Sequence, residues 1–125
     1  NYILPNVAID VTASQNIKDF AADPLYELTY RAGVHSAVLN TDSAAYVLFV
    51  SQTNSNSFVI YQYAMDGDSL LHTHYREFDQ QVEVRDVMQS ADQGLVVLGS
   101  IRIVGKYRRP LLLKIPVDQF LPENL

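Results

Sequence analysis

Two histidines lie two positions apart in a segment that alternates polar and apolar residues as a strand does. His72 and His74 open the run 72–78, and residues i and i+2 of a strand project from the same face of the sheet. Two imidazoles on one face can bind one metal ion, with His35 or Glu77 as a third ligand. The spacing fixes no third ligand, and two surface histidines on an outer strand are the simpler explanation of the pattern. A small metal-binding module is therefore one hypothesis.

A second group of reactive side chains surrounds a tyrosine in the segment 104–110, which holds three of the nine basic residues. Paired Lys and Arg donors bind carboxylate, sulfate or phosphate groups, and the ring of Tyr107 offers a stacking face for a sugar or a base. A surface hairpin without a ligand, kept in solvent by its charged side chains, would have the same composition as a binding loop. The segment is thus a candidate binding loop, and a plain surface hairpin is the alternative.

The acidic residues favour turns over catalysis. Asp66-Gly67-Asp68 lies between two apolar segments, which is typical of a tight turn, and the following residues lack the ligand series of a calcium loop. Asp42 and Asp92 occupy turn positions as well. The sequence holds no Gly-x-Ser-x-Gly, His-Glu-x-x-His, phosphate-loop or dinucleotide-binding motif. We therefore assign no catalytic residue and expect no cofactor; a fragment or subunit of a carbohydrate-active enzyme, with carboxylates converging in three dimensions, is the alternative.

The length and composition of the chain limit which folds could position these residues. The chain has 125 residues, of which 48% are hydrophobic and 18% charged, so we expect one domain with a real core and little disorder. The net charge of −5 disfavours nucleic acid and anionic lipid as partners. The absence of cysteine excludes disulfides, thiolate zinc sites and a thiol nucleophile. Since no apolar run approaches ~18 residues, we also expect no membrane span.

Short apolar segments rich in β-branched and aromatic residues, bounded by turn formers, predict an all-β fold. One short helix is expected over 14–22, where Ser14 could cap it and Asp23-Pro24 would end it. Residues 1–24 form an N-terminal extension in this scheme, and units of about 25–78 and 79–125 follow. The expected strands are 25–31, 35–40, 45–52, 58–64, 69–78, 82–89, 94–103 and 110–116.

An internal repeat organises these strands. Residues 37–51 align without a gap with residues 86–100 at an offset of 49, and 58–63 align with 110–115. Leu25–Arg31 likewise resembles Leu70–Arg76. Because the second and third strands of each copy are apolar on successive residues, both of their faces should be covered. The pattern predicts antiparallel four-stranded units, repeated twice like β-propeller blades; a β-sandwich is the alternative.

The second copy resembles a known repeat family. Ser90-Ala-Asp-Gln-Gly-Leu-Val-Val-Leu-Gly-Ser100, followed by Leu113-Lys-Ile-Pro-Val-Asp118, is similar to the pattern T-x-D-G-G-Y-I-V-x-G-S and then L-x-K-L-D of exported bacterial β-propeller-type repeats. Such repeats are found in surface proteins and lipoproteins of Bacteroidetes. Gln93 stands where that pattern has its first Gly. The resemblance implies blades of a propeller and an extracytoplasmic location: periplasmic, cell-surface or secreted.

Topology then indicates where a binding site would lie. Two blades cannot close a ring, so we expect self-association or the remainder of a longer chain. In an up-and-down sheet, alternate loops emerge at one end, which gathers 31–35, 54–57, 76–81 and 106–109 at one rim. The function we expect is a non-enzymatic binding or assembly module that presents this rim to a glycan, peptide or protein. The expected ligand-binding residues are Lys106, Tyr107, Arg108, Arg109, Arg76 and His35.

Overall fold

A computed structural model describes residues 33–65, 70–102 and 107–121. The seven strands lie within two residues of seven of the expected segments. The expected strand 25–31, helix 14–22, extension 1–24 and turn 66–68 lie outside the described residues. The elements are β1 (His35–Asn40), β2 (Ala45–Gln52), β3 (Ser57–Ala64), β4 (Leu70–Glu77), β5 (Val82–Gln89), β6 (Leu95–Arg102), β7 (Arg108–Ile115) and the 3₁₀ helix η2 (Val117–Phe120).

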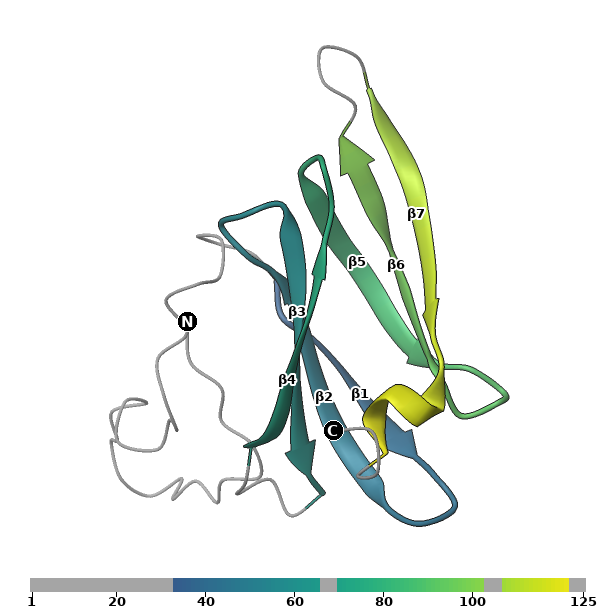
Figure 1. Cartoon of the computed structure of the whole chain (residues 1–125). Coiled ribbons are helices and arrows are strands. Elements are labelled where there is room, and N and C mark those ends of the chain that lie inside the picture. Colours follow the sequence, from purple (N-terminus) through teal and green to yellow (C-terminus); the bar gives the residue numbers. More distant parts are fainter. Residues whose placement is uncertain (1–32, 66–69, 103–106, 122–125) are drawn as a thin grey trace, which may run out of the picture.

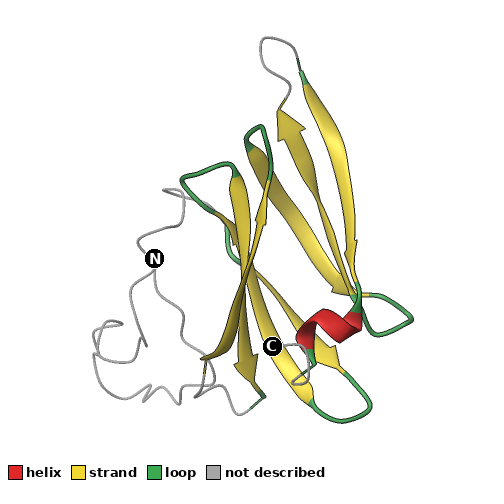
Figure 2. Cartoon of the chain, viewed as in Figure 1, coloured by secondary structure: helices red, strands yellow, loops and turns green. Residues whose placement is uncertain are grey.

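The strands form two antiparallel sheets, so the predicted all-β class is confirmed. One sheet has the order β1-β2-β3-β4 and the other the order β5-β6-β7. They face each other, with β5 packed against β1, β2 and β3 (Figures 1 and 2). Among the described strands the second sheet therefore has three strands where four were expected. Two facing sheets occur both in neighbouring propeller blades and in a sandwich. No helix among the described residues has the length and apolar composition needed to cross a bilayer.

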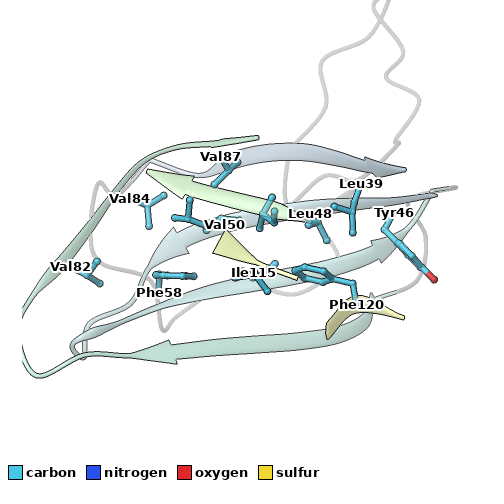
Figure 3. Close-up of a cluster of buried hydrophobic side chains, with 13 residues drawn as sticks. Leu39, Tyr46, Leu48, Val50, Phe58, Val82, Val84, Val87, Ile115 and Phe120 are labelled. Carbon is cyan, nitrogen blue, oxygen red and sulfur yellow. The ribbon is translucent and has the colours of Figure 1, made fainter. Parts of the chain in front are cut away.

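One hydrophobic core fills the space between the sheets (Figure 3). Alternate residues of β2 and β6 point inward, so Leu48, Val50, Leu95 and Val97 are all fully buried. Phe120 of η2 closes one end of this core and is fully buried too. The inner faces of both sheets thus share a single apolar layer, which includes Leu39, Tyr46, Phe58, Ile60, Val82, Val84, Val87 and Ile115.

The outer faces of the two sheets differ. In the first sheet, Val59, Tyr61 and Tyr63 are buried and form a second cluster with Val47 and Phe49. In the second sheet, the prediction that both faces are covered is wrong: Leu112 on the outer face of β7 is 69% exposed. Residues 111–113 are all leucine, but only Leu111 and Leu113 point inward, toward the buried side chains of β6.

Strand pairing also corrects the sequence alignment of the two sheets. At the expected offset, Leu39 corresponds to Met88, yet Leu39 is fully buried and Met88 is 49% exposed. Leu39 lies opposite Tyr46, whereas Gln89 lies opposite Leu95. Relative to β2 and β6, Asp86–Gln89 of β5 are thus displaced by one residue, and β7 is displaced likewise from its expected match with β3. A one-residue shift moves every side chain to the other face, so the alignment of these strands was wrong.

Candidate functional site

The loops at one end of both sheets are tied together by hydrogen bonds. Phe78 N donates to Asn56 O at 2.7 Å, and Asn56 Nδ2 donates to Asp79 O at 3.3 Å. Arg102 N at the end of β6 donates to Gln81 O at 2.9 Å. These contacts bring the β2–β3 loop, the β4–β5 loop and the end of β6 to one edge of the molecule, here called the loop rim (Figure 1).

An open groove of about 550 Å³ lies on this rim, at the side of the first sheet. The β2–β3 loop forms one wall and the end of β4 forms the other, since Ser57 and Glu77 are directly opposite each other in the sheet. Tyr75 and Glu77 are alternate residues of β4 and therefore share its outer face. The lining residues are Thr53, Asn54, Ser55, Ser57, Tyr75 and Glu77.

Three hydroxyl groups shape the floor of the groove. Thr53 Oγ1 lies 2.6 Å from Ser57 Oγ and 3.0 Å from Ser55 Oγ, and the two serine hydroxyls are 3.2 Å apart. Thr53 N also donates to Ser57 O at 3.0 Å, which closes the loop. Each hydroxyl can both donate and accept a hydrogen bond. The cluster therefore holds the loop in shape. Thr53 and Ser57 are buried, whereas Asn54 and Ser55 are exposed and are the polar side chains of this loop that a polyhydroxylated ligand can reach.

Tyr75 and Glu77 supply the other chemistry of the groove. The Tyr75 side chain is 51% exposed, so its ring offers an apolar surface beside the hydroxyl cluster. Glu77 is exposed at the end of β4 and adds a carboxylate acceptor. Sequence reasoning placed 54–57 on the rim but missed Thr53 and Tyr75 as site residues. Alternation along β4 was the available signal, because it sets Tyr75 on the same face as Glu77.

The ligand-binding residues expected from the sequence have separate surroundings. Tyr107 is 59% exposed and Arg109 lies over its ring, 6.0 Å from the centroid. Arg108 forms an ion pair with Glu83 at 2.9 Å, and Lys106 lies outside the described residues. His35 Nε2 donates to Val84 O at 3.1 Å, between the sheets. Tyr107 and Arg109 thus form a pair on the second sheet, whereas Arg76 lies on β4 of the first sheet.

Arg76 instead lines a smaller cavity of about 130 Å³ between β4 and η2. Ile60, Ile115 and Phe120 form its apolar part, and His74 and Gln119 add polar groups. A cavity of this size accommodates only a few non-hydrogen atoms. It is a less suitable binding site than the rim groove.

His72 and His74 do share a face, with ring centroids 4.7 Å apart. His74 Nε2 donates to Gln62 Oε1 at 2.8 Å, and Gln62 Nε2 donates to Phe120 O at 2.9 Å. Burial, helped by the nearby His72 and Arg76 charges, lowers the pKa of His74 to about 4. Within the described ranges, no three His, Asp or Glu side chains gather as metal ligands. Metal binding by this pair stays a prediction without a third ligand.

Comparison of the chain with protein-family models, with curated proteins and with solved structures gave no match. The resemblance to exported propeller-type repeats therefore stays a prediction. Functional inference depends on the geometry of the site itself.

Proposed function

We propose that this chain is a non-enzymatic binding module that takes a glycan in the groove of the loop rim. The observation that carries the proposal is the half-exposed ring of Tyr75 beside a cluster of hydroxyl groups and the Glu77 carboxylate. A sugar has one apolar C–H face and a rim of hydroxyls. An aromatic ring covers the first, and hydroxyl and carboxylate groups bind the second. A volume of about 550 Å³ is in the range of small-molecule sites.

The charge of the groove narrows the ligand class. Glu77 is the charged residue among the six that line it. A carboxylate accepts hydrogen bonds from sugar hydroxyls but repels the carboxylate or sulfate of an acidic sugar. The ligand is therefore a neutral glycan rather than an acidic one. A peptide or protein partner on the same rim is the second candidate, because Tyr side chains are also frequent anchors in protein interfaces.

The resemblance to exported propeller-type repeats supports an extracytoplasmic location, where polymeric glycans are abundant. It also supports treating each sheet as one blade of a propeller-like protein. Both statements are part of the proposal, and they agree with a site formed by loops at one end of the blades.

An array of immobilised neutral and acidic oligosaccharides tests the function. We expect wild-type protein to bind neutral members, and Tyr75→Ala to weaken binding by about twofold to tenfold, since stacking on an aromatic ring contributes about 0.5–1.5 kcal/mol. Glu77→Gln should weaken it severalfold. The matched control is Tyr107→Ala, because Tyr107 is also more than half exposed, at 59%, but lies at the start of β7 in the other sheet. Absence of binding by wild-type protein, or equal losses in the two tyrosine variants, would overturn the proposal.

A further inference from the structure

A second, smaller hollow adjoins the groove of the loop rim. It has a volume of about 110 Å³, and its lining residues are Ser55, Asn56, Ser57, Glu77 and Phe78. Three of these residues, Ser55, Ser57 and Glu77, also line the groove. The two spaces therefore lie side by side and share one wall, to which the Glu77 carboxylate belongs. The smaller space is called the side hollow below.

Contacts within the chain fix the shape of the side hollow. Phe78 N donates to Asn56 O at 2.7 Å, which extends the β3–β4 ladder by one residue. Asn56 Nδ2 donates to Asp79 O at 3.3 Å. The ring of Phe78 packs against that of Phe58, with the two centroids 5.8 Å apart. Because these contacts are already made in the free protein, a ligand does not have to order this part of the rim.

The polar groups of the side hollow suit a second sugar residue. Asn56 is exposed, and its amide oxygen can accept a hydrogen bond from a sugar hydroxyl while the amide nitrogen holds Asp79 O. Glu77 is the charged residue of this lining too, so a neutral sugar fits here for the same reason as in the groove. A carboxylate has two oxygens that accept hydrogen bonds. Glu77 can therefore bind hydroxyls of two neighbouring residues of one glycan.

The distance between the two spaces matches two linked sugar rings. Tyr75 and Phe78 are three residues apart, which corresponds to about 10 Å of extended chain at 3.3 Å per residue. Two linked pyranose rings have about this length. The side hollow, at about 110 Å³, accommodates part of a pyranose ring, and the remainder of that ring stays in solvent. A single sugar residue on Tyr75 would leave the side hollow to water.

We propose that the loop rim binds two consecutive residues of a neutral glycan, one against Tyr75 in the groove and the next in the side hollow. This inference rests on the proposed function and adds to it the length of the ligand. Glu77 accepts hydrogen bonds from both sugar residues, and Asn56 accepts one from the second alone. The two asparagines of the loop thus contact different sugar residues, since Asn54 lines the groove and Asn56 lines the side hollow.

Isothermal titration calorimetry of the full chain with mono-, di- and trisaccharides of glucose, mannose and galactose measures the dependence on ligand length. We expect a disaccharide to bind about threefold to tenfold more tightly than its monosaccharide, which is the effect of one additional hydrogen bond. A third sugar residue should add no measurable affinity. Binding of no saccharide would overturn the proposed function. Binding of a monosaccharide with no gain for the disaccharide, or with a further equal gain for the trisaccharide, would overturn this inference alone.

Two variants of the loop test the assignment of the side hollow. Asn56→Ala should remove most of the gain that the second sugar residue provides and leave the affinity for the monosaccharide unchanged, which also shows that the loop keeps its shape. Asn54→Ala is the matched control, because it should weaken binding of the monosaccharide and the disaccharide by the same factor. Equal weakening of both saccharides by Asn56→Ala would contradict a separate site for the second residue.

Discussion

At the scale of single residues, His74 couples the first sheet to the C-terminal 3₁₀ helix. Its Nε2–H binds Gln62, and Gln62 in turn binds the carbonyl of Phe120. Gln62 is fully buried, so its amide depends on these partners for hydrogen bonds. These two hydrogen bonds therefore stabilise η2 against the sheet. One of them depends on the imidazole of His74, which titrates in acidic solution.

The lowered pKa of His74 predicts a loss of stability in acid. Its pKa is about 4 in the folded protein, against 6.5 for the ordinary side chain, so the unfolded chain binds a proton more readily. The contribution of neutral His74 to the free energy of unfolding is complete above pH 6.5, and it is lost as the pH falls from 6.5 to 4. Because the side chain is only half-buried, we expect a loss of about 1 kcal/mol. Urea unfolding at a series of pH values measures it.

Two glutamine variants separate this effect from the titration of carboxylates. His74→Gln keeps a hydrogen-bond donor without a titrating group, so its stability should change less than that of wild type between pH 6.5 and 4. His72→Gln removes the second-largest cause of the lowered pKa of His74. It should reduce the loss of stability between pH 6.5 and 4 without abolishing it. An identical pH dependence in His74→Gln and wild type would contradict the assignment.

Some single residues could be assigned from the sequence and others could not. Asp92 was expected in a turn, and its carboxylate accepts hydrogen bonds from Lys114, Ser90 Oγ and Gly94 N, which lowers its pKa to about 2. Gln93 has a positive φ of 72°, a backbone conformation that glycine adopts more readily than other residues. Alternation along β4 could have placed Tyr75 on the same face as Glu77, but the loop that completes the groove lies about twenty residues earlier in the chain, and the sequence does not show that the two meet.

At the scale of elements, Gly99 permits the close approach of β5 and β6. Pairing of these strands shifts between Val84 and Asp86, at a bulge. A Cβ on Gly99 would lie 2.2 Å from the carbonyl oxygen of Glu83. No side chain fits there without displacement of the β5 backbone, so the glycine at this position has a steric cause.

Gly99→Ala should therefore destabilise the protein strongly. The contact is with backbone, which cannot rotate away as a side chain would, and we expect a loss of about 2–4 kcal/mol in the free energy of unfolding. Gly33→Ala is the control, since the nearest atom to its Cβ would be His35 Nε2 at 3.6 Å, and it should change stability by less than about 0.5 kcal/mol. Chemical denaturation compares the two. Similar stability of both variants would show that the strands can move apart at the bulge.

Strand positions were predictable because apolar runs and turn residues are local signals. The pairing register was not, because it depends on the length of the turn after β5 and on the bulge near Arg85. Neither feature has a signature in the sequence. The turn displaces Asp86–Gln89 by one residue from the alignment, and the bulge restores the expected offset for Val82–Val84. The alignment of β2 with β6 survived, because inward residues such as Leu48 and Val97 stay buried in both sheets.

At the scale of the whole molecule, the two sheets depend on each other. Their inner faces form one core, and hydrogen bonds join them at both ends. Val84 N donates to Gln52 Oε1 at 3.0 Å near the rim, and Gln89 Nε2 donates to Asn40 O at 2.6 Å at the other end. The facing of the sheets could be inferred from the apolar strands, but the exposure of the second sheet's outer face could not, since burial depends on which neighbours are present.

A shared core predicts that both sheets unfold in one transition. Val50 of the first sheet and Val97 of the second are both fully buried in that core, and truncating either to Ala should cost about 2 kcal/mol. If the sheets unfold together, each substitution lowers the protection of the slowest amides by the same free energy in both sheets. Hydrogen exchange followed by mass spectrometry measures this, with Leu112→Ala as an exposed control that leaves exchange unchanged. Faster exchange confined to the substituted sheet would mean that each sheet is a separate folding unit, and the facing sheets would then be two blades held together only by their contact.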